Sequence, residues 1–224
     1  MKNAKAMALM LICGLTTTFS LSSCLDNDGG NNGGVIPTMT IADSIEACQK
    51  TAGNYTGKLY YVNPNKPYND REDSVDVTWT ISAETIKTNR LVMDNFPIKT
   101  LALYVANSGT VDKSKEVLEA SASQKLTTDA IPYLKLSTQN SVFYQFNIKT
   151  KETRMEFDTE YDGNTHHVIV DFTERIQDSN GYYYYPLAQF YNNVFQGNIC
   201  IEKVYVDGFE HRIANVFGIK AKKS

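Results

Sequence analysis

Three histidines are the side chains in this sequence best suited to binding a metal ion or moving a proton. His166 and His167 are adjacent, and neighbours in a β-strand point to opposite faces, so they do not easily share one metal ion. His166 falls on the same face as Val168 and Val170, which favours a position at the rim of the core. His211 lies well apart from both. The sequence therefore predicts no metal site and no cofactor.

Motifs typical of catalysis are absent from the sequence. It contains no Gly-x-Ser-x-Gly turn, no Walker loop and no His-Glu-x-x-His pair. A glycosidase would need two converging carboxylates, and nothing singles out two of the 25 acidic residues. A non-catalytic protein is therefore favoured, with a hydrolase as an alternative.

Four consecutive tyrosines could supply a binding face, because tyrosine combines a large contact area with a polar tip. They are Tyr182, Tyr183, Tyr184 and Tyr185, in a chain with 14 tyrosines. Tyrosine also has a high strand propensity. An ordinary strand with tyrosine on both faces is therefore the favoured interpretation, and a binding face is the alternative.

The first 23 residues have the proportions of a secretory signal peptide. Lys2 and Lys5 precede an apolar stretch, residues 6–15, that is shorter than the about 20 residues of a transmembrane helix. Leu21-Ser22-Ser23-Cys24 then resembles the bacterial lipobox, whose cysteine takes a diacylglyceryl group by thioether linkage. The resemblance implies cleavage before Cys24 and attachment to the membrane by acyl chains on this residue.

Residues 24–38 are expected to form a tether, because residues 25–34 are polar and glycine-rich and cannot bury enough apolar surface to fold. A typical reach for such a segment is roughly 20 Å. Asp26 and Asp28 resemble the surface-export signal of Bacteroidota lipoproteins. The expected location is the outer membrane, with the protein facing either the periplasm or the cell surface.

The charge of the mature chain argues against nucleic acid as a partner. Cleavage would remove Lys2 and Lys5 and no acidic residue, which changes the net charge from −3 to −5. Nucleic-acid binding needs a basic surface, and so does electrostatic attachment to anionic lipid.

Two of the four cysteines, Cys48 and Cys200, remain after Cys13 is removed and Cys24 is acylated. An exported protein can form disulfides, so these two are a candidate pair. Free cysteine is also among the most buried residue types. Two buried thiols are the favoured interpretation, and a bridge is the alternative.

Residues 39–224 are expected to form one β-rich domain that opens with a helix. Thr40 can cap this helix, Asp43 completes a capping box, and Gly53 fits its end. Its apolar face is expected at Ile41, Ile45, Cys48 and Ala52. In the middle of the chain, residues 96–105 fit both a helical and a strand period, and we expect a helix there and another over 113–124.

Alternating apolar and polar residues predict strands through the rest of the chain. Trp79, the only tryptophan, lies on the apolar side of one of them and is expected in the core. Turns are predicted at Asp162-Gly163-Asn164 and at residues 178–181, and Asp207-Gly208 predicts a two-residue hairpin turn because both residues tolerate positive φ. The strands are expected at about residues 55–62, 75–81, 142–148, 154–157, 168–172, 182–190, 199–205 and 210–220.

Regularly spaced strands with tight turns predict a β-rich α+β fold built on an antiparallel meander. Such a sheet protects its edges by closing as a lipocalin-like barrel or by forming a sandwich. The lipobox, a short capped helix and the segment Ala52-Gly53-Asn54-Tyr55-Thr56-Gly57-Lys58-Leu59 together resemble a lipoprotein family of gut Bacteroidota, some members of which carry calycin-like β-domains. The resemblance implies this fold and brings no catalytic residue.

Three functions fit these observations. The favoured one is an envelope or cell-surface lipoprotein that binds a small ligand, a glycan or an envelope protein without catalysis. The binding site would be the interior of a barrel or the tyrosine-rich face. The alternatives are a structural or accessory subunit of an envelope assembly and a hydrolase acting on envelope glycans.

Overall fold

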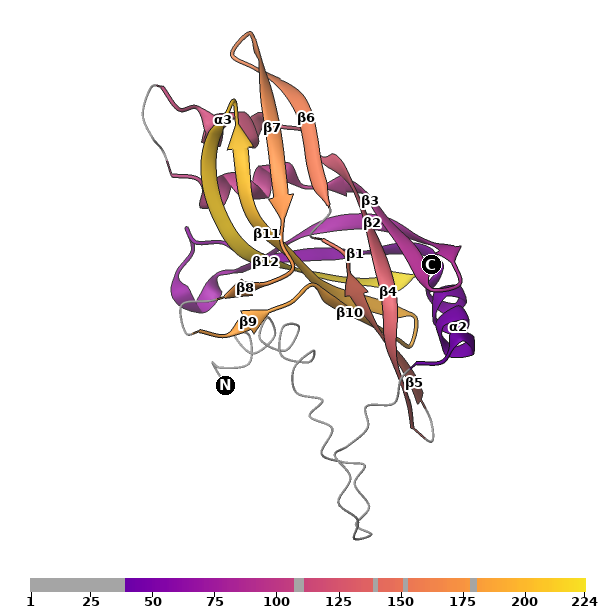
Figure 1. Cartoon of the computed structure of the whole chain (residues 1–224). Coiled ribbons are helices and arrows are strands. Elements are labelled where there is room, and N and C mark those ends of the chain that lie inside the picture. Colours follow the sequence, from indigo (N-terminus) through magenta and orange to yellow (C-terminus); the bar gives the residue numbers. More distant parts are fainter. Residues whose placement is uncertain (1–38, 107–110, 139–140, 151–152, 178–180) are drawn as a thin grey trace.

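The computed structural model describes residues 39–106, 111–138, 141–150, 153–177 and 181–224, which form a β-rich structure with a few short helices (Figure 1). The predicted signal peptide, the acylation site at Cys24 and the tether lie outside the described residues. Ten of the described strands belong to one sheet in which every pairing is antiparallel. The predicted fold class, a β-rich α+β fold with an antiparallel meander, is confirmed.

Eight strands of this sheet pair in a closed ring, because β10 pairs with both β5 and β11. The order around the ring is β10-β5-β4-β3-β2-β1-β12-β11. The first and last of these strands along the chain are paired, with Tyr55 opposite Lys223. In chain order, the ring contains β1 (Gly53–Val62), β2 (Glu72–Thr85), β3 (Thr88–Phe96), β4 (Gln124–Thr138), β5 (Ser141–Ile148), β10 (Leu187–Tyr191), β11 (Val194–Val206) and β12 (Phe209–Lys223).

The sheet forks along one side of β11. β10 pairs with the N-terminal half of β11, and β7 (Asn164–Phe172) pairs with its C-terminal half. β6 (Arg154–Tyr161) pairs with β7 and completes the hairpin at the top of Figure 1. β8 (Ile176–Gln177) and β9 (Tyr183–Tyr184) form a separate two-stranded sheet between β7 and β10 along the chain.

Within the described residues, four short helices accompany the strands. α2 (Ile41–Thr51) packs against β2 and β4, whereas η2 (Ile98–Tyr104) and α3 (Ser114–Ala120) pack against each other. The helix predicted over residues 96–105 is thus present as the 3₁₀ helix η2, and the one predicted over 113–124 is present in shorter form as α3. The remaining 3₁₀ helix is η1 (Tyr68–Asp70).

The predicted capping box of α2 is confirmed, because Thr40 Oγ1 accepts a hydrogen bond from the Asp43 amide at 3.1 Å. The predicted apolar face is wrong at its first position, since Ile41 is 57% exposed. Thr51 is tolerated on the buried face because its hydroxyl donates to the Ala47 carbonyl at 2.7 Å. The residues of α2 that are buried are Ser44, Ala47, Cys48 and Thr51.

Aromatic side chains fill the space that the ring encloses. Trp79, which the sequence predicts in the core, is 2% exposed and stacks on Tyr55 with 5.9 Å between ring centroids. Tyr55 and Phe146 both pack against Phe195, so rings from β1, β2, β5 and β11 meet across the interior. They belong to one cluster with the other buried apolar residues. The interior is therefore occupied by the protein's own side chains.

Lys135 of β4 attaches α2 to the ring, and we expect this contact to make the fold acid-sensitive. Its Nζ lies 2.7 Å from Asp43 Oδ1 and 2.6 Å from Glu46 Oε2. Hydrogen bonds from Lys135 lower the pKa of both carboxyl groups. A carboxyl group with a lowered pKa in the folded state stabilises the fold above its unfolded pKa, and this contribution is lost as the pH falls through the folded value.

Lys135→Met should therefore flatten the decline in stability between about pH 5 and pH 3. Urea unfolding across this range would measure it. Lys58→Met is the matched control, since it removes an ion pair of 2.9 Å with Asp76, whose side chain is 87% exposed. If Lys135→Met does not change how the free energy of unfolding depends on pH, the carboxyl groups of Asp43 and Glu46 do not contribute to acid sensitivity.

Gly197 permits the β10–β11 pairing that closes the ring. A Cβ at this position would lie 2.5 Å from Ala188 Cβ and 2.7 Å from the Leu187 carbonyl oxygen. We expect Gly197→Val to destabilise the protein by about 1–3 kcal/mol, because strand β10 would have to move away. Gln196→Val, which introduces the same side chain at the neighbouring half-buried position, should cost less in the same urea titration. Equal costs would contradict the close-approach explanation.

Candidate functional site

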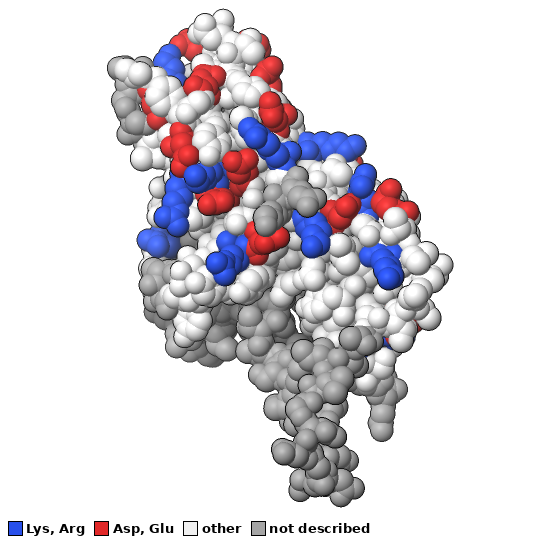
Figure 2. Space-filling view, in the orientation of Figure 1, with Lys and Arg blue, Asp and Glu red and all other residues white. Residues whose placement is uncertain are grey.

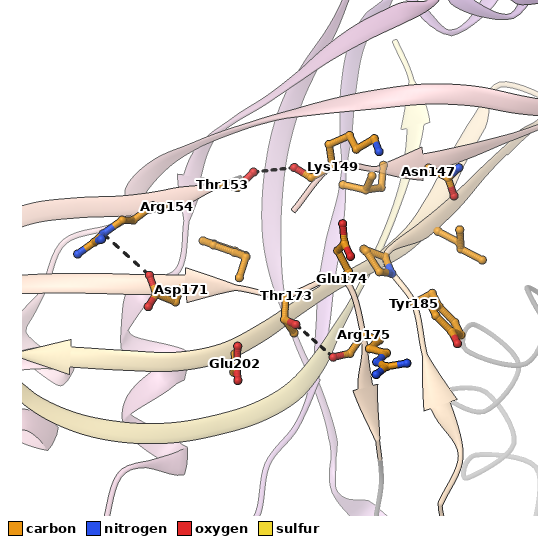
Figure 3. A pocket seen from close by; sticks show the side chains of 14 residues that line it. Asn147, Lys149, Thr153, Arg154, Asp171, Thr173, Glu174, Arg175, Tyr185 and Glu202 are labelled. Atoms are coloured by element: carbon orange, nitrogen blue, oxygen red, sulfur yellow. Dashed lines mark hydrogen bonds and ion pairs between the residues drawn. The ribbon is translucent and has the colours of Figure 1, made fainter. Parts of the chain in front are cut away.

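A partly open cleft with a volume of about 930 Å³ lies where the sheet forks (Figure 3). The two arms of the fork diverge from β11 and leave room between the ends of several strands. We call this hollow the fork cleft. It is bounded by residues 147–149 at the end of β5, 153–154 at the start of β6, 171–175 at and after the end of β7, 185–187 at the start of β10, and Glu202 of β11.

A β-bulge places Glu202 in the wall of the fork cleft. Ile201 pairs with Phe172 and Lys203 pairs with Asp171, so Glu202 has no partner in β7. β12 pairs with the other edge of β11 and shows the same register shift. Beside this shift, Ala214 of β12 has a φ of 42°. Left-handed backbone at alanine is strained, and both bulges and strained residues occur preferentially beside functional sites. The local backbone thus directs a carboxylate into the fork cleft at an energetic cost.

Hydrogen bonds hold the opposite wall of the fork cleft in place. The Lys149 carbonyl oxygen accepts hydrogen bonds from the hydroxyl groups of Thr128 and Thr153, each at 2.9 Å. The buried Thr150 hydroxyl donates to the Thr173 carbonyl at 2.7 Å, which ties the end of β5 to the end of β7. These hydrogen bonds connect the segments that form this wall.

Six charged side chains, three of each sign, line the fork cleft. The cations are Lys149, Arg154 and Arg175, and the anions are Asp171, Glu174 and Glu202. In Figure 3, Arg154, Asp171 and Glu202 lie at one end, and Arg175 and Tyr185 lie at the other. Arg154 Nε is 3.9 Å from Asp171 Oδ1 and 3.6 Å from Glu156 Oε2, and such long, solvent-exposed ion pairs are weak.

The run of four tyrosines adjoins the fork cleft. Tyr185 lines it directly and is 45% exposed. Tyr183 is 43% exposed, and its ring lies 5.1 Å from the guanidinium carbon of Arg175, which also lines the cleft. Tyr182 is 69% exposed, whereas Tyr184 is half-buried. Tyr185 thus lines the fork cleft directly, and Tyr183 is connected to it through Arg175.

The three histidines lie outside the fork cleft, and each has a different carboxylate partner. His166 Nδ1 is 2.6 Å from Asp207 Oδ2, and His211 Nε2 is 3.5 Å from Asp112 Oδ2. His167 Nδ1 is 2.7 Å from Asp158 Oδ1, and this hydrogen bond raises the pKa of the imidazole. Within the described ranges, no group of three or more His, Cys, Asp or Glu side chains could hold a metal ion.

Cys48 and Cys200, the candidate disulfide pair, are both buried, and no disulfide joins them. Burial raises the pKa of the Cys48 thiol, and the Cys200 thiol donates to the Tyr184 carbonyl at 3.8 Å. The structure thus has the unbridged arrangement.

Of the residues that line the fork cleft, only Tyr185 was predicted from the sequence as a candidate binding residue. One signal was available, because the apolar alternation of β11 changes phase at Glu202. Ile199 and Ile201 are buried before it, and Val204 and Val206 after it. A change of phase within one strand indicates a bulge. The strand ends that complete the cleft carry no comparable signal.

The surface shows no extended patch of one charge on the face in Figure 2, where basic and acidic side chains are interspersed. This arrangement agrees with the small net charge of the chain, −3. Among the described helices, none combines the length and the apolar character that crossing a membrane requires.

Comparison with known proteins identifies one family. The family described as Domain of unknown function (DUF4840) matches residues 50–206, which run from the end of α2 to the end of β11 and include every residue that bounds the fork cleft. No curated protein and no solved structure matches the chain. Because the match covers more than half of the sequence, the chain belongs to the DUF4840 family.

Proposed function

We propose that this chain is a non-catalytic binding lipoprotein of the cell envelope, of the Bacteroidota type and calycin-like in plan. Acyl chains on Cys24 attach it to the outer membrane, and its β-rich part faces the periplasm or the cell surface. The ligand or partner binds in the fork cleft. The net negative charge expected for the mature chain argues against nucleic acid as this ligand.

The fork cleft itself is the observation that carries this proposal. Its volume of about 930 Å³ lies within the range of about 300–1,000 Å³ that is common for ligand sites. Hydrogen bonds connect the segments of its wall, and a bulge in β11 places Glu202 in the lining. The ring interior offers less support for a ligand, because Trp79, Tyr55 and Phe195 occupy it.

Thermal unfolding in the presence of candidate ligands tests the proposal. The probes are neutral oligosaccharides, mixed-charge peptides and nucleotides, each in excess. A ligand at about 100 times its Kd stabilises the folded state by about 2.7 kcal/mol, so binding raises Tm. Glu202→Gln keeps the shape of the side chain and should abolish most of this rise. Glu119→Gln, an exposed glutamate of α3, is the control.

If Glu202→Gln leaves the rise in Tm unchanged, the ligand binds outside the fork cleft. The absence of any rise in Tm would contradict the proposal.

The hydrolase alternative is favoured by one observation, the presence of Asp171, Glu174 and Glu202 in one cleft. Incubation of the oligosaccharides with the protein, followed by chromatography, distinguishes the two functions. Shortened products that disappear in Glu202→Gln would favour the hydrolase.

A further inference from the structure

The polar groups of the fork cleft both donate and accept hydrogen bonds. Lysine and arginine side chains only donate, and ionised carboxylates only accept. The cleft has three of each kind, with Asn147 and Thr173 able to do both. A ligand rich in hydroxyl groups matches this lining, because each hydroxyl group also donates and accepts. An anionic ligand such as a nucleotide would meet three carboxylates, and an apolar ligand would make no hydrogen bonds with the charged side chains.

The backbone of the fork cleft disfavours an extended peptide. Peptides that add a strand to a sheet bind through free backbone N–H and C=O groups. The amides of Ile148 and Leu187 already donate to the carbonyls of Pro186 and Tyr185, each at 2.8 Å. The amides of Lys149 and Thr173 donate to Asp129 and Cys200. These four amides are therefore occupied and cannot pair with an added strand.

The exposed tyrosines continue the fork cleft as an aromatic platform. Tyr185 lines the cleft, and Tyr183 contacts Arg175, which lines it too. The face of an aromatic ring is negative and apolar, so it attracts the polarised C–H groups on the flat side of a sugar ring. Because the cleft is partly open, a chain of sugars can extend from it over Tyr183.

We infer that the fork cleft and the platform of Tyr183 and Tyr185 bind a neutral oligosaccharide. This inference rests on the proposed function and names its ligand class. The sugar inside the fork cleft exchanges hydrogen bonds with the six charged side chains and stacks on Tyr185. Sugars outside the cleft stack on Tyr183.

Isothermal titration of the full acylated chain in detergent tests this inference. The probes are cello-, xylo-, manno- and malto-oligosaccharides from disaccharide to hexasaccharide. At least one series should bind, with an affinity that increases with length. Tyr185→Ala should weaken every member of that series by about tenfold, whereas Tyr183→Ala should weaken only the longer members. Phe209→Ala is the control, because Phe209 is as exposed as Tyr185, at 45%, and lies outside the cleft.

Charged comparators separate this inference from the proposed function. They are a sulfated heparin tetrasaccharide, a chitosan tetrasaccharide and a mixed-charge peptide. If only these bind, and Tyr185→Ala weakens them, the fork cleft is a binding site and the neutral-glycan inference is wrong. If no probe of any class binds, both are wrong. Equal losses in Tyr185→Ala and Phe209→Ala would also overturn the inference, because the effect would not depend on the platform.

Discussion

Trp79→Ala is expected to lower the free energy of unfolding by about 3–5 kcal/mol, the usual cost of removing a buried tryptophan. The side chain is 2% exposed, and its ring is stacked on Tyr55 at an interplanar angle of 11°. Tyr55 packs in turn against Phe195 of β11, two strands away around the ring. Removing the indole leaves a cavity between these rings that rigid strands cannot collapse to fill.

Urea unfolding followed by far-ultraviolet circular dichroism measures this loss, since Trp79 is the only tryptophan and its fluorescence disappears with it. Trp79→Phe is the control. The indole Nε1 has no hydrogen-bond partner in the described residues, so phenylalanine loses no hydrogen bond and should cost much less. A loss below about 1 kcal/mol for Trp79→Ala would show that the site is not a rigid part of the core.

Cys24→Ala should transfer the protein from the membrane fraction to the soluble fraction. The expected anchor consists of acyl chains, in which each buried CH₂ contributes about 0.8 kcal/mol. None of the described helices could replace it by crossing the membrane. Centrifugation of cell membranes, with metabolic labelling by a radioactive fatty acid, measures both attachment and acylation.

Cys13→Ala is the matched control for this experiment. Both cysteines precede the described residues, but only Cys24 completes the lipobox-like Leu21-Ser22-Ser23-Cys24. Cys13→Ala should therefore leave labelling and membrane attachment unchanged. Retention of Cys24→Ala in the membrane fraction would contradict the lipid anchor while leaving the fork cleft unaffected.

Strands with a clean alternation were predictable from the sequence, and strands with mixed signals were not. β5 and β7 follow their apolar periods, and in the last hairpin Asp207 and Gly208 both have positive φ, as the predicted turn requires. β3 and β4 were not predicted. β4 contains Pro132, which is tolerated because the register shifts beside it, where a ladder hydrogen bond is not needed.

The fork cleft could not be predicted because its walls come from strand ends that only the closed ring brings together. Residues 147–149 and 185–187 become neighbours through the pairing of β5 with β10. Residues 171–175 join them because β7 pairs with one half of β11 and β10 with the other. A single sequence shows the period of each strand, but the partner of each strand depends on the whole sheet.

The pairing of β1 with β12 also determines when the protein can complete its folding. Because Tyr55 lies opposite Lys223, the ring cannot close until β1 and β12 are both available to pair. Contacts between such distant residues form slowly, since a long loop must first lose its conformational entropy. Until then β1 and β11 each keep an unpaired edge, which invites pairing with other chains. Truncation within β12 should therefore promote aggregation more than the loss of its few buried side chains would suggest.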